Sequence, residues 1–260
     1  MTSKSNPQIQ RYSFDQLQMI AEGLDPSRSL VHKFGANDDV GATAEDIWTP
    51  GGTYTFPQAA ETVRIKSGGN AADAAAGAGA REVTIVGLDE NWNLVSEAVA
   101  TAGASQSLAT TATFIRVFRA YVSSVGTYGA ANTGAIQIEN TTSTTVLAYI
   151  GAGLGQTEMA IYTVPANKKA YLLGIEATVD TNQSADLRMW RREQADDVTV
   201  PFQAKRLVTR FLALGTAADR VIKALVEFPE KTDIWMDATS GGASSLVAAS
   251  FDLVLVDQES

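Results

Sequence analysis

Short runs in which apolar and polar residues alternate recur along most of the chain, and they restrict its fold more than any other feature. In "AYLLGIEATVD", Tyr171, Leu173, Ile175, Ala177 and Val179 fall on one side of an extended chain. Such alternation indicates a half-buried antiparallel strand. Similar runs are "ETVRIKSG", "FIRVFRAYV", "AIQIEN", "TTVLAYI", "ADLRMWRRE" and "ASFDLVLVD". Gly, Asn and Thr turns separate them, so the sequence predicts one or two antiparallel β-sandwich (jelly-roll-like) domains and a mainly β fold.

Two stretches in the first half fit this pattern less directly. In "REVTIVGLDENWNLVSEAV", Val83 and Ile85 point to one side, and residues 89–93 are turn-forming types. This arrangement predicts a β-hairpin. The preceding residues 68–80, "GGNAADAAAGAGA", are almost all Ala and Gly, and we expect a loop of small residues there.

Residues 201–231 fit two kinds of secondary structure. The spacing of Leu207, Phe211 and Leu214 fits a helix, whereas "VTRFLAL" and "VIKALVEF" also fit strands. Short apolar runs do not separate a buried strand from a buried helix segment. We expect strands in this stretch because strands surround it in the sequence.

The N-terminal residues 1–29 differ from the rest and form an expected arm. Leu17, Ile20, Ala21 and Leu24 recur at the spacing of one helix face, which predicts a short amphipathic helix. Their apolar stripe is too small to form a core of its own, so it must cover either its own domain or a neighbouring subunit. We expect these four side chains to anchor the protein to its neighbour.

The β-rich remainder has a plausible division near its midpoint. The Ser/Thr-rich residues 141–146 suit either a linker or a strand of β-branched residues. Each half holds enough strands for a small sandwich. The expected organisation is therefore an arm (1–29), a first β-sandwich domain (30–143) and a second one (144–260).

A glycine-rich segment, "VLAYIGAGLGQTEMAIYTVP", raises the question of nucleotide binding. Gly151, Gly153 and Gly155 follow a strand-like run, but Gln156 stands where the dinucleotide fingerprint has its third glycine. The residues that follow favour a strand, and Pro165 then ends the segment. Without a helix N-terminus there is no row of free N–H groups for a pyrophosphate. We therefore interpret these glycines as a connection between strands.

Composition restricts the possible functions further. The 260 residues are 45% hydrophobic, which is typical of a globular protein, and no apolar run is long enough to span a membrane. The net charge of −9 argues against a nucleic-acid partner, which usually requires a basic surface. With no cysteine and no apolar signal-like start, we expect synthesis in a reducing cytoplasm.

No catalytic or metal-binding motif is visible in the sequence. A single His32 cannot build a histidine-rich metal site, and a structural or surface role suits it better than that of a general base. The acidic pairs Asp38/Asp39 and Asp196/Asp197 lack the spacing of a calcium loop and suit polar turns. We therefore expect no enzyme activity, no cofactor and no metal site.

One basic cluster surrounds a tryptophan: Arg188, Arg191 and Arg192 flank Trp190. It allows an anionic contact with a stacking aromatic. Because the chain as a whole is acidic, we interpret this cluster as a strand whose exposed face carries arginines and not as an anion-binding site.

Three segments together resemble structural proteins of tailed-bacteriophage virions. The first is "AREVTIVGLDENWNLVSEAVATAG…TTATFIRVFRAYV", the second "GQTEMAIYTVPANKKAYLLGIEATVD", and the third "FPEKTDIWMDATS…FDLVLVD". They cover most of residues 30–257. Asn167 stands where glycine is usual, a change that a turn tolerates because Asn also adopts left-handed geometry. The resemblance implies a virion component that works by assembly and carries no active site.

Several functions are compatible with this resemblance. We expect a capsid decoration or head-projection protein that binds the major capsid protein or a neighbouring virion protein. The alternative is a tail-associated adhesin or fibre-type protein, with Trp92, Trp190 or Trp235 stacking on host glycan. A virion glycan hydrolase is a third, weaker hypothesis. None of these requires a nucleic-acid or membrane partner.

The C-terminal run predicts that the protein assembles with itself. In "FDLVLVDQ", Phe251, Leu253 and Leu255 lie on one face, while Val254 and Val256 lie on the other. A strand that is apolar on both faces is usually covered on both, by its own domain or by a partner. We expect a homo-oligomer, and a trimer by analogy with phage decoration proteins.

Overall fold

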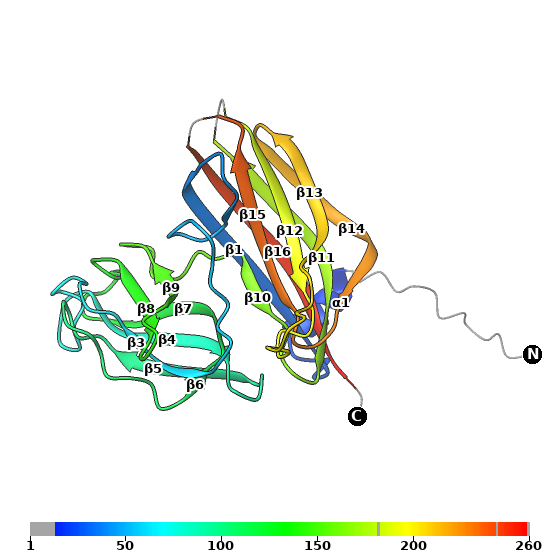
Figure 1. Ribbon diagram of the computed structural model, residues 1–260. Coiled ribbons are helices and arrows are strands. Elements are labelled where there is room, and N and C mark those ends of the chain that lie inside the picture. The colour runs from blue at the N-terminus through cyan, green and yellow to red at the C-terminus, as the bar shows by residue number, and fades with distance from the viewer. Residues whose placement is uncertain (1–13, 181–182, 243, 259–260) are drawn as a thin grey trace, which may run out of the picture.

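Pairing between the first and last long strands closes the larger part of the molecule. The computed structural model describes residues 14–180, 183–242 and 244–258. Among them β1 (Arg28–Val40) pairs antiparallel with β16 (Ser245–Asp257) along most of its length. The expected fold class is confirmed, because the described residues form antiparallel sheets with one short helix, α1 (Phe14–Ala21), near the N-terminus (Figure 1).

Two sheets face each other in this part, which we call the sandwich. The first sheet has the order β1-β16-β11-β14, and the second has the order β10-β15-β12-β13 with β2 also paired to β15. The remaining bounds are β2 (Glu45–Asp46), β10 (Ile161–Thr163), β11 (Lys168–Val179), β12 (Ala185–Arg192), β13 (Arg206–Leu214), β14 (Ala217–Phe228) and β15 (Asp233–Ser240). β13 and β14 confirm the strands expected within residues 201–231.

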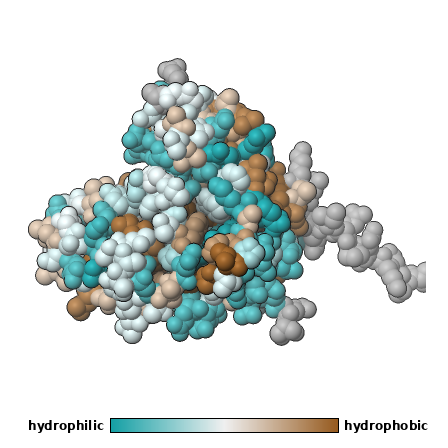
Figure 2. Space-filling view, viewed as in Figure 1, coloured by the Kyte–Doolittle hydropathy of each residue, from teal (hydrophilic) through white to brown (hydrophobic). Residues whose placement is uncertain are grey.

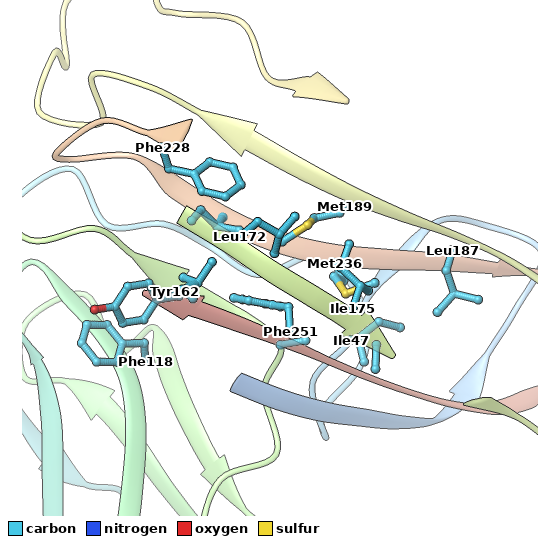
Figure 3. Packing of buried hydrophobic residues seen from close by; sticks show 14 of the residues in the cluster. Ile47, Phe118, Tyr162, Leu172, Ile175, Leu187, Met189, Phe228, Met236 and Phe251 are labelled. Carbon is cyan, nitrogen blue, oxygen red and sulfur yellow. The ribbon is translucent and has the colours of Figure 1, made fainter. Parts of the chain in front are cut away.

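Large apolar side chains fill the space between the two sheets (Figure 3). Leu172 and Phe251 come from the first sheet, and Met189 and Met236 come from the second; all four are fully buried. Burying a side chain of this size stabilises a fold by about 1.5–3 kcal/mol. These side chains form the core of the sandwich.

A bulge in β11 changes which residues face this core. The pairing of β11 with both of its neighbours shifts between Leu172 and Gly174. Leu172 and Ile175 are buried, whereas Tyr171 and Leu173 are half-buried and lie on the outer face. The expectation that Tyr171 and Leu173 share a face with Ile175 is therefore wrong, because an extra residue in a strand reverses the sides of everything before it.

Residues 61–150 form a second β structure, which we call the inserted unit. One sheet has the order β6-β3-β8-β9 and the other β5-β4-β7. Their bounds are β3 (Glu61–Ile65), β4 (Ala80–Leu88), β5 (Leu94–Ala100), β6 (Thr113–Phe114), β7 (Arg116–Val125), β8 (Ile136–Asn140) and β9 (Val146–Ile150). The chain leaves the sandwich after β2 and returns at β10, so this unit interrupts the sandwich (Figure 1).

Strand pairing does not follow the expected boundary between residues 143 and 144. That boundary falls in the turn between β8 and β9, which are neighbours in one sheet. The N–H of Thr144 donates to the carbonyl of Asn140 across this turn, at 3.1 Å. β1, expected in the first domain, pairs instead with β16. The Ser/Thr-rich segment resembles a linker in composition, but its residues serve as turn formers here.

The two irregular stretches of the inserted unit agree with expectation. β4 and β5 pair as a hairpin from Glu82 and Ala100 to Leu88 and Leu94. Residues 68–79 form a loop that the buried carboxylate of Asp73 organises. It accepts hydrogen bonds from the N–H groups of Ala80, Thr133 and Gly134, each at 2.8 Å. Three charge-assisted bonds offset the cost of burying this carboxylate.

A buried ion pair joins the inserted unit to the sandwich. Arg116 of β7 donates to both carboxylate oxygens of Asp233 on β15, at 2.8 and 3.0 Å. The two side chains are 2% and 0% exposed. Asp233 also accepts from Arg192 and from the hydroxyl of Thr163, and the Arg116 guanidinium lies 4.9 Å from the ring centre of Trp92. Bidentate geometry and added hydrogen bonds are what a desolvated pair requires.

Apolar packing extends across the same junction. Phe118 of the inserted unit packs against Tyr162 of β10, with 4.7 Å between ring centres (Figure 3). Trp235 of β15 belongs to the hydrophobic cluster that contains Phe114 of β6. Both hydrophobic clusters therefore contain side chains from both units, and the inserted unit packs against β10 and the outer face of β15, where Lys33 of β1 also donates to the carbonyl of Phe118.

The first prediction concerns the buried ion pair. Asp233→Ala leaves the Arg116 guanidinium buried without its partner, and we expect it to lower the free energy of unfolding by about 3–5 kcal/mol. Lys231→Ala is the matched control, because it removes a partly exposed ion pair with Asp196 and should cost at most about 1 kcal/mol. Urea unfolding measures both, and equal losses for the two variants would contradict the assigned role of Asp233.

Candidate functional site

The outer face of the first sheet carries the helix that the sequence predicts as an anchor. Val254 points away from the sandwich core, since its neighbours Leu253 and Leu255 point into it. Val254 and Ile20 are nevertheless buried, at 0% and 6% exposed, although both lie outside the two hydrophobic clusters. Met19 and Ile20 line a hollow together with side chains of β1, β11 and β16. The helix therefore packs on this outer face.

Of the four side chains of the predicted apolar stripe, some pack on the sheet and others face solvent. Ile20 is buried and Leu17 is half-buried, whereas Ala21 is exposed and Leu24 is 63% exposed. Leu24 lies beyond the helix because Gly23, with φ of 72°, ends it. The structure thus brings Leu17 and Ile20 onto the chain's own sheet and leaves Leu24 free on the surface.

Two hollows flank α1 on this face. One, of about 610 Å³, is lined by Met19, Tyr171 and Leu225 among others, and the other, of about 410 Å³, by Leu17, Leu30 and Val221 among others. Met19, Leu24, Leu30, Val221 and Leu225 are each at least 41% exposed. We call the side chains of these five residues the apolar surface. Figure 2 shows further hydrophobic surface along the β13–β14 side of the molecule.

Charged groups border the apolar surface. Asp25 pairs with Arg28 at 2.5 Å, and His32 contacts Asp252 at 2.7 Å. The Ser27 hydroxyl donates to Asp25, which holds the pKa of that carboxyl below its usual value. His32 thus lies on the surface, as the sequence analysis favoured.

A cavity of about 380 Å³ lies where the segment between β2 and β3 passes over the second sheet. Asp46 and Asp237 sit opposite each other on β2 and β15, and both are buried. Asp237 accepts from Arg188 Nε at 2.7 Å and from Trp190 Nε1 at 2.9 Å. Oδ2 of Asp46 accepts from the N–H of Tyr54 at 2.6 Å, but no described residue donates to its Oδ1. We call this space the junction cavity.

Aromatic rings and two cations complete the junction cavity. Phe56 and Trp235 form one wall, with ring centres 5.4 Å apart. The exposed Lys205 holds its ammonium 4.4 Å from the ring centre of Trp190, at the mouth. Arg192 lines the cavity and donates to Asp233 through Nη2. The cavity therefore combines an apolar wall with both hydrogen-bond donors and an acceptor.

Burial and the neighbouring Asp237 carboxylate raise the pKa of Asp46 to about 6. Because the folded protein then holds a proton that the unfolded chain has lost, Asp46 makes the fold less stable as pH rises from about 4 to 6. Relative to Asp46→Asn, we expect the wild-type free energy of unfolding to fall by roughly 2–3 kcal/mol across that window. Urea titrations at several pH values measure it, and parallel curves for the two proteins would show that Asp46 does not titrate there.

The arginine cluster has mostly structural partners. Arg188 pairs with Asp237, Arg192 with Asp233, and Arg191 with Glu193. These contacts agree with a strand whose outer face carries arginines. Of the tryptophans that the adhesin alternative names, Trp92 is 7% exposed and Trp190 is half-buried, while Trp235 is 8% exposed and lines the junction cavity.

The other residues considered from the sequence lie in turns or at strand ends. Asp197 accepts from Thr199, and Asp196 pairs with Lys231. The segment after Gly155 continues into strand β10, and the N–H of Gly155 donates to Asn132 Oδ1 at 2.9 Å. Within the described ranges, no three Asp, Glu or His side chains are placed to hold a metal ion. In the same residues, no helix is long and apolar enough to cross a bilayer.

Comparisons with known proteins add little. No family model matches the chain, and no curated protein matches its sequence. The structure of the Gx strain of infectious bursal disease virus aligns with 88% of this chain and 72% of its own, at 11% identity and a TM-score of 0.26. T=1 particles derived from infectious bursal virus align with 90% and 75%, at 10% identity and a TM-score of 0.21. TM-scores this low do not establish a common fold.

The junction cavity was not predicted from the sequence. Asp46 precedes a Gly/Pro-rich stretch, and Asp237 follows Trp235 and Met236, so neither carries a motif. Pairing of β2 with β15 brings them together. The alternation of β15, in which Asp233, Trp235 and Asp237 share one face, is the one sequence signal that such a site offered.

Proposed function

We propose that this chain is a non-enzymatic structural protein of a tailed-bacteriophage virion, acting as a capsid decoration or head-projection protein. The observation that carries the proposal is the apolar surface around α1. Exposed apolar side chains gathered on one face mark a site for another protein. The resemblance of three sequence segments to structural proteins of tailed phages supports the same function.

The proposed partners are the major capsid protein or a neighbouring virion protein, together with further copies of this chain. The apolar surface includes Leu24, from the predicted anchor, and Leu30, from the first strand. In this proposal the protein is made in the host cytoplasm and then joins the particle through this face. In this proposal the inserted unit, which packs against β10 and β15, would stay outside the contact.

Binding to particles tests the anchor. Leu24 is 63% exposed, so Leu24→Asp places a charge on the apolar surface without disturbing the core. We expect it to weaken binding to particles that lack the protein by at least about tenfold, because an unpaired charge opposes burial. Leu94→Asp, at an equally exposed leucine of the inserted unit, is the control and should bind normally. Removing residues 1–28 is a poorer test, since it uncovers Val254.

Solution assembly tests the proposed self-association. We expect light scattering on the full chain to show an oligomer, with a trimer as the proposed state. Val221→Asp, at a residue 70% exposed, should shift the protein toward monomer, while Leu108→Asp, at a residue 87% exposed in the inserted unit, should not. A monomer at high concentration for the wild type would refute self-association and leave the capsid partner as the remaining one.

A further inference from the structure

The junction cavity lies on the second sheet, away from the apolar surface, and the proposed assembly function does not use it. Its volume falls within the range of about 300–1,000 Å³ that is usual for small-molecule sites. Such sites combine apolar walls with a few polar groups, and this cavity is lined by the sandwich and by the segment that precedes the inserted unit. We propose that the junction cavity binds a neutral pyranose unit of a saccharide.

The charges of the cavity select a neutral ligand. Asp46 and Asp237 line the cavity, where an anion would meet two buried carboxylates. Lys205 and Arg192 also line it and are more exposed, and there a cation would meet like charges. A ligand without net charge that carries both donors and acceptors satisfies both kinds of group. Polyhydroxylated molecules have this property.

Unused hydrogen-bonding capacity faces such a ligand. Asp46 is 6% exposed, and its Oδ1 accepts from no described residue, so a ligand hydroxyl can donate to it. A bond to a charged group contributes about 1.5–3 kcal/mol. Lys205 forms no ion pair among the described residues, and Arg192 uses one nitrogen for Asp233. Both cations therefore have N–H groups available for ligand oxygens.

The aromatic wall is the reason that we propose a pyranose ring and not a smaller polyol as the ligand. Phe56 and Trp235 lie at an interplanar angle of 60° and give the cavity an apolar side. A pyranose ring presents an apolar C–H face to such a surface while its hydroxyls point to the rim. Lys205 lies within 6.0 Å of the Trp235 ring centre, so one side chain borders both the wall and the mouth.

Saturation-transfer NMR on the full chain tests this proposal. The probes are the methyl pyranosides of glucose, galactose, mannose and N-acetylglucosamine, followed by a glycan microarray. We expect transfer to the ring protons of at least one neutral pyranoside. Asp46→Asn and Lys205→Met should each weaken that binding by about tenfold or more, which corresponds to about 1.4 kcal/mol. Lys205 is exposed, so its variant should fold normally even if Asp46→Asn does not.

Asp252→Asn is the matched control, because it neutralises a carboxylate on the first sheet, far from the cavity, and should leave binding unchanged. Methyl glucuronide and methyl glucosaminide test the charge argument and should bind more weakly than the neutral probes. Three results would overturn the proposal: no binding to any pyranoside or arrayed glycan, binding that survives both cavity variants, or preference for a charged probe. None of these three results affects the particle-binding assay, so the assembly function is tested independently of the cavity.

Discussion

The buried pair of Arg116 and Asp233 is the interaction on which the arrangement of the two units depends. Taking both charges out of water is costly, and only the bidentate contact, the added bonds from Arg192 and Thr163, and the ring of Trp92 offset that cost. An ion pair with such strict geometry tolerates few relative positions of its partners. It therefore favours one placement of the inserted unit on the second sheet, and the mixed hydrophobic clusters form around that placement.

The junction cavity follows from the same placement. Phe56 lies on the segment that leads to the inserted unit, and the guanidinium of Arg116 lies 5.3 Å from its ring centre. Arg192 contacts both Asp233 and the Phe56 ring, so one cluster of charges serves the junction and the cavity wall. The lining residues all come from the sandwich and the segment before residue 61, and the inserted unit supports the cavity through the contact of Arg116 with Phe56. The apolar surface depends on the sandwich and α1 only.

Local patterns in the sequence predict the individual strands and turns of this fold well. They predict much less well which distant strands pair with each other. Alternation identifies the β11 and β16 strands, and turn residues identify the β4–β5 hairpin, because both signals act between near neighbours. No local signal marks the bulge beside Leu173. The residues of β11 that precede the bulge are therefore assigned to the wrong face of the sheet. The division at residue 143 fails because a Ser/Thr-rich turn and a linker share their composition. The pairing of Asp46 with Asp237 depends on the complete topology, and no local pattern contains it.

The interruption of the sandwich by the inserted unit also determines an order of folding. Residues 61–150 are contiguous, and the strands of their two sheets pair with one another apart from a bridge between Tyr121 and Gln156, so they can form while the chain is still being synthesised. β1 must wait, because its partner β16 is synthesised after all the other described strands. Until then its apolar residues lack their neighbour, and contacts this distant in sequence form slowly. Once folded, the inserted unit would hold the two parts of the interrupted sandwich close together, and this would speed the pairing of β1 with β16.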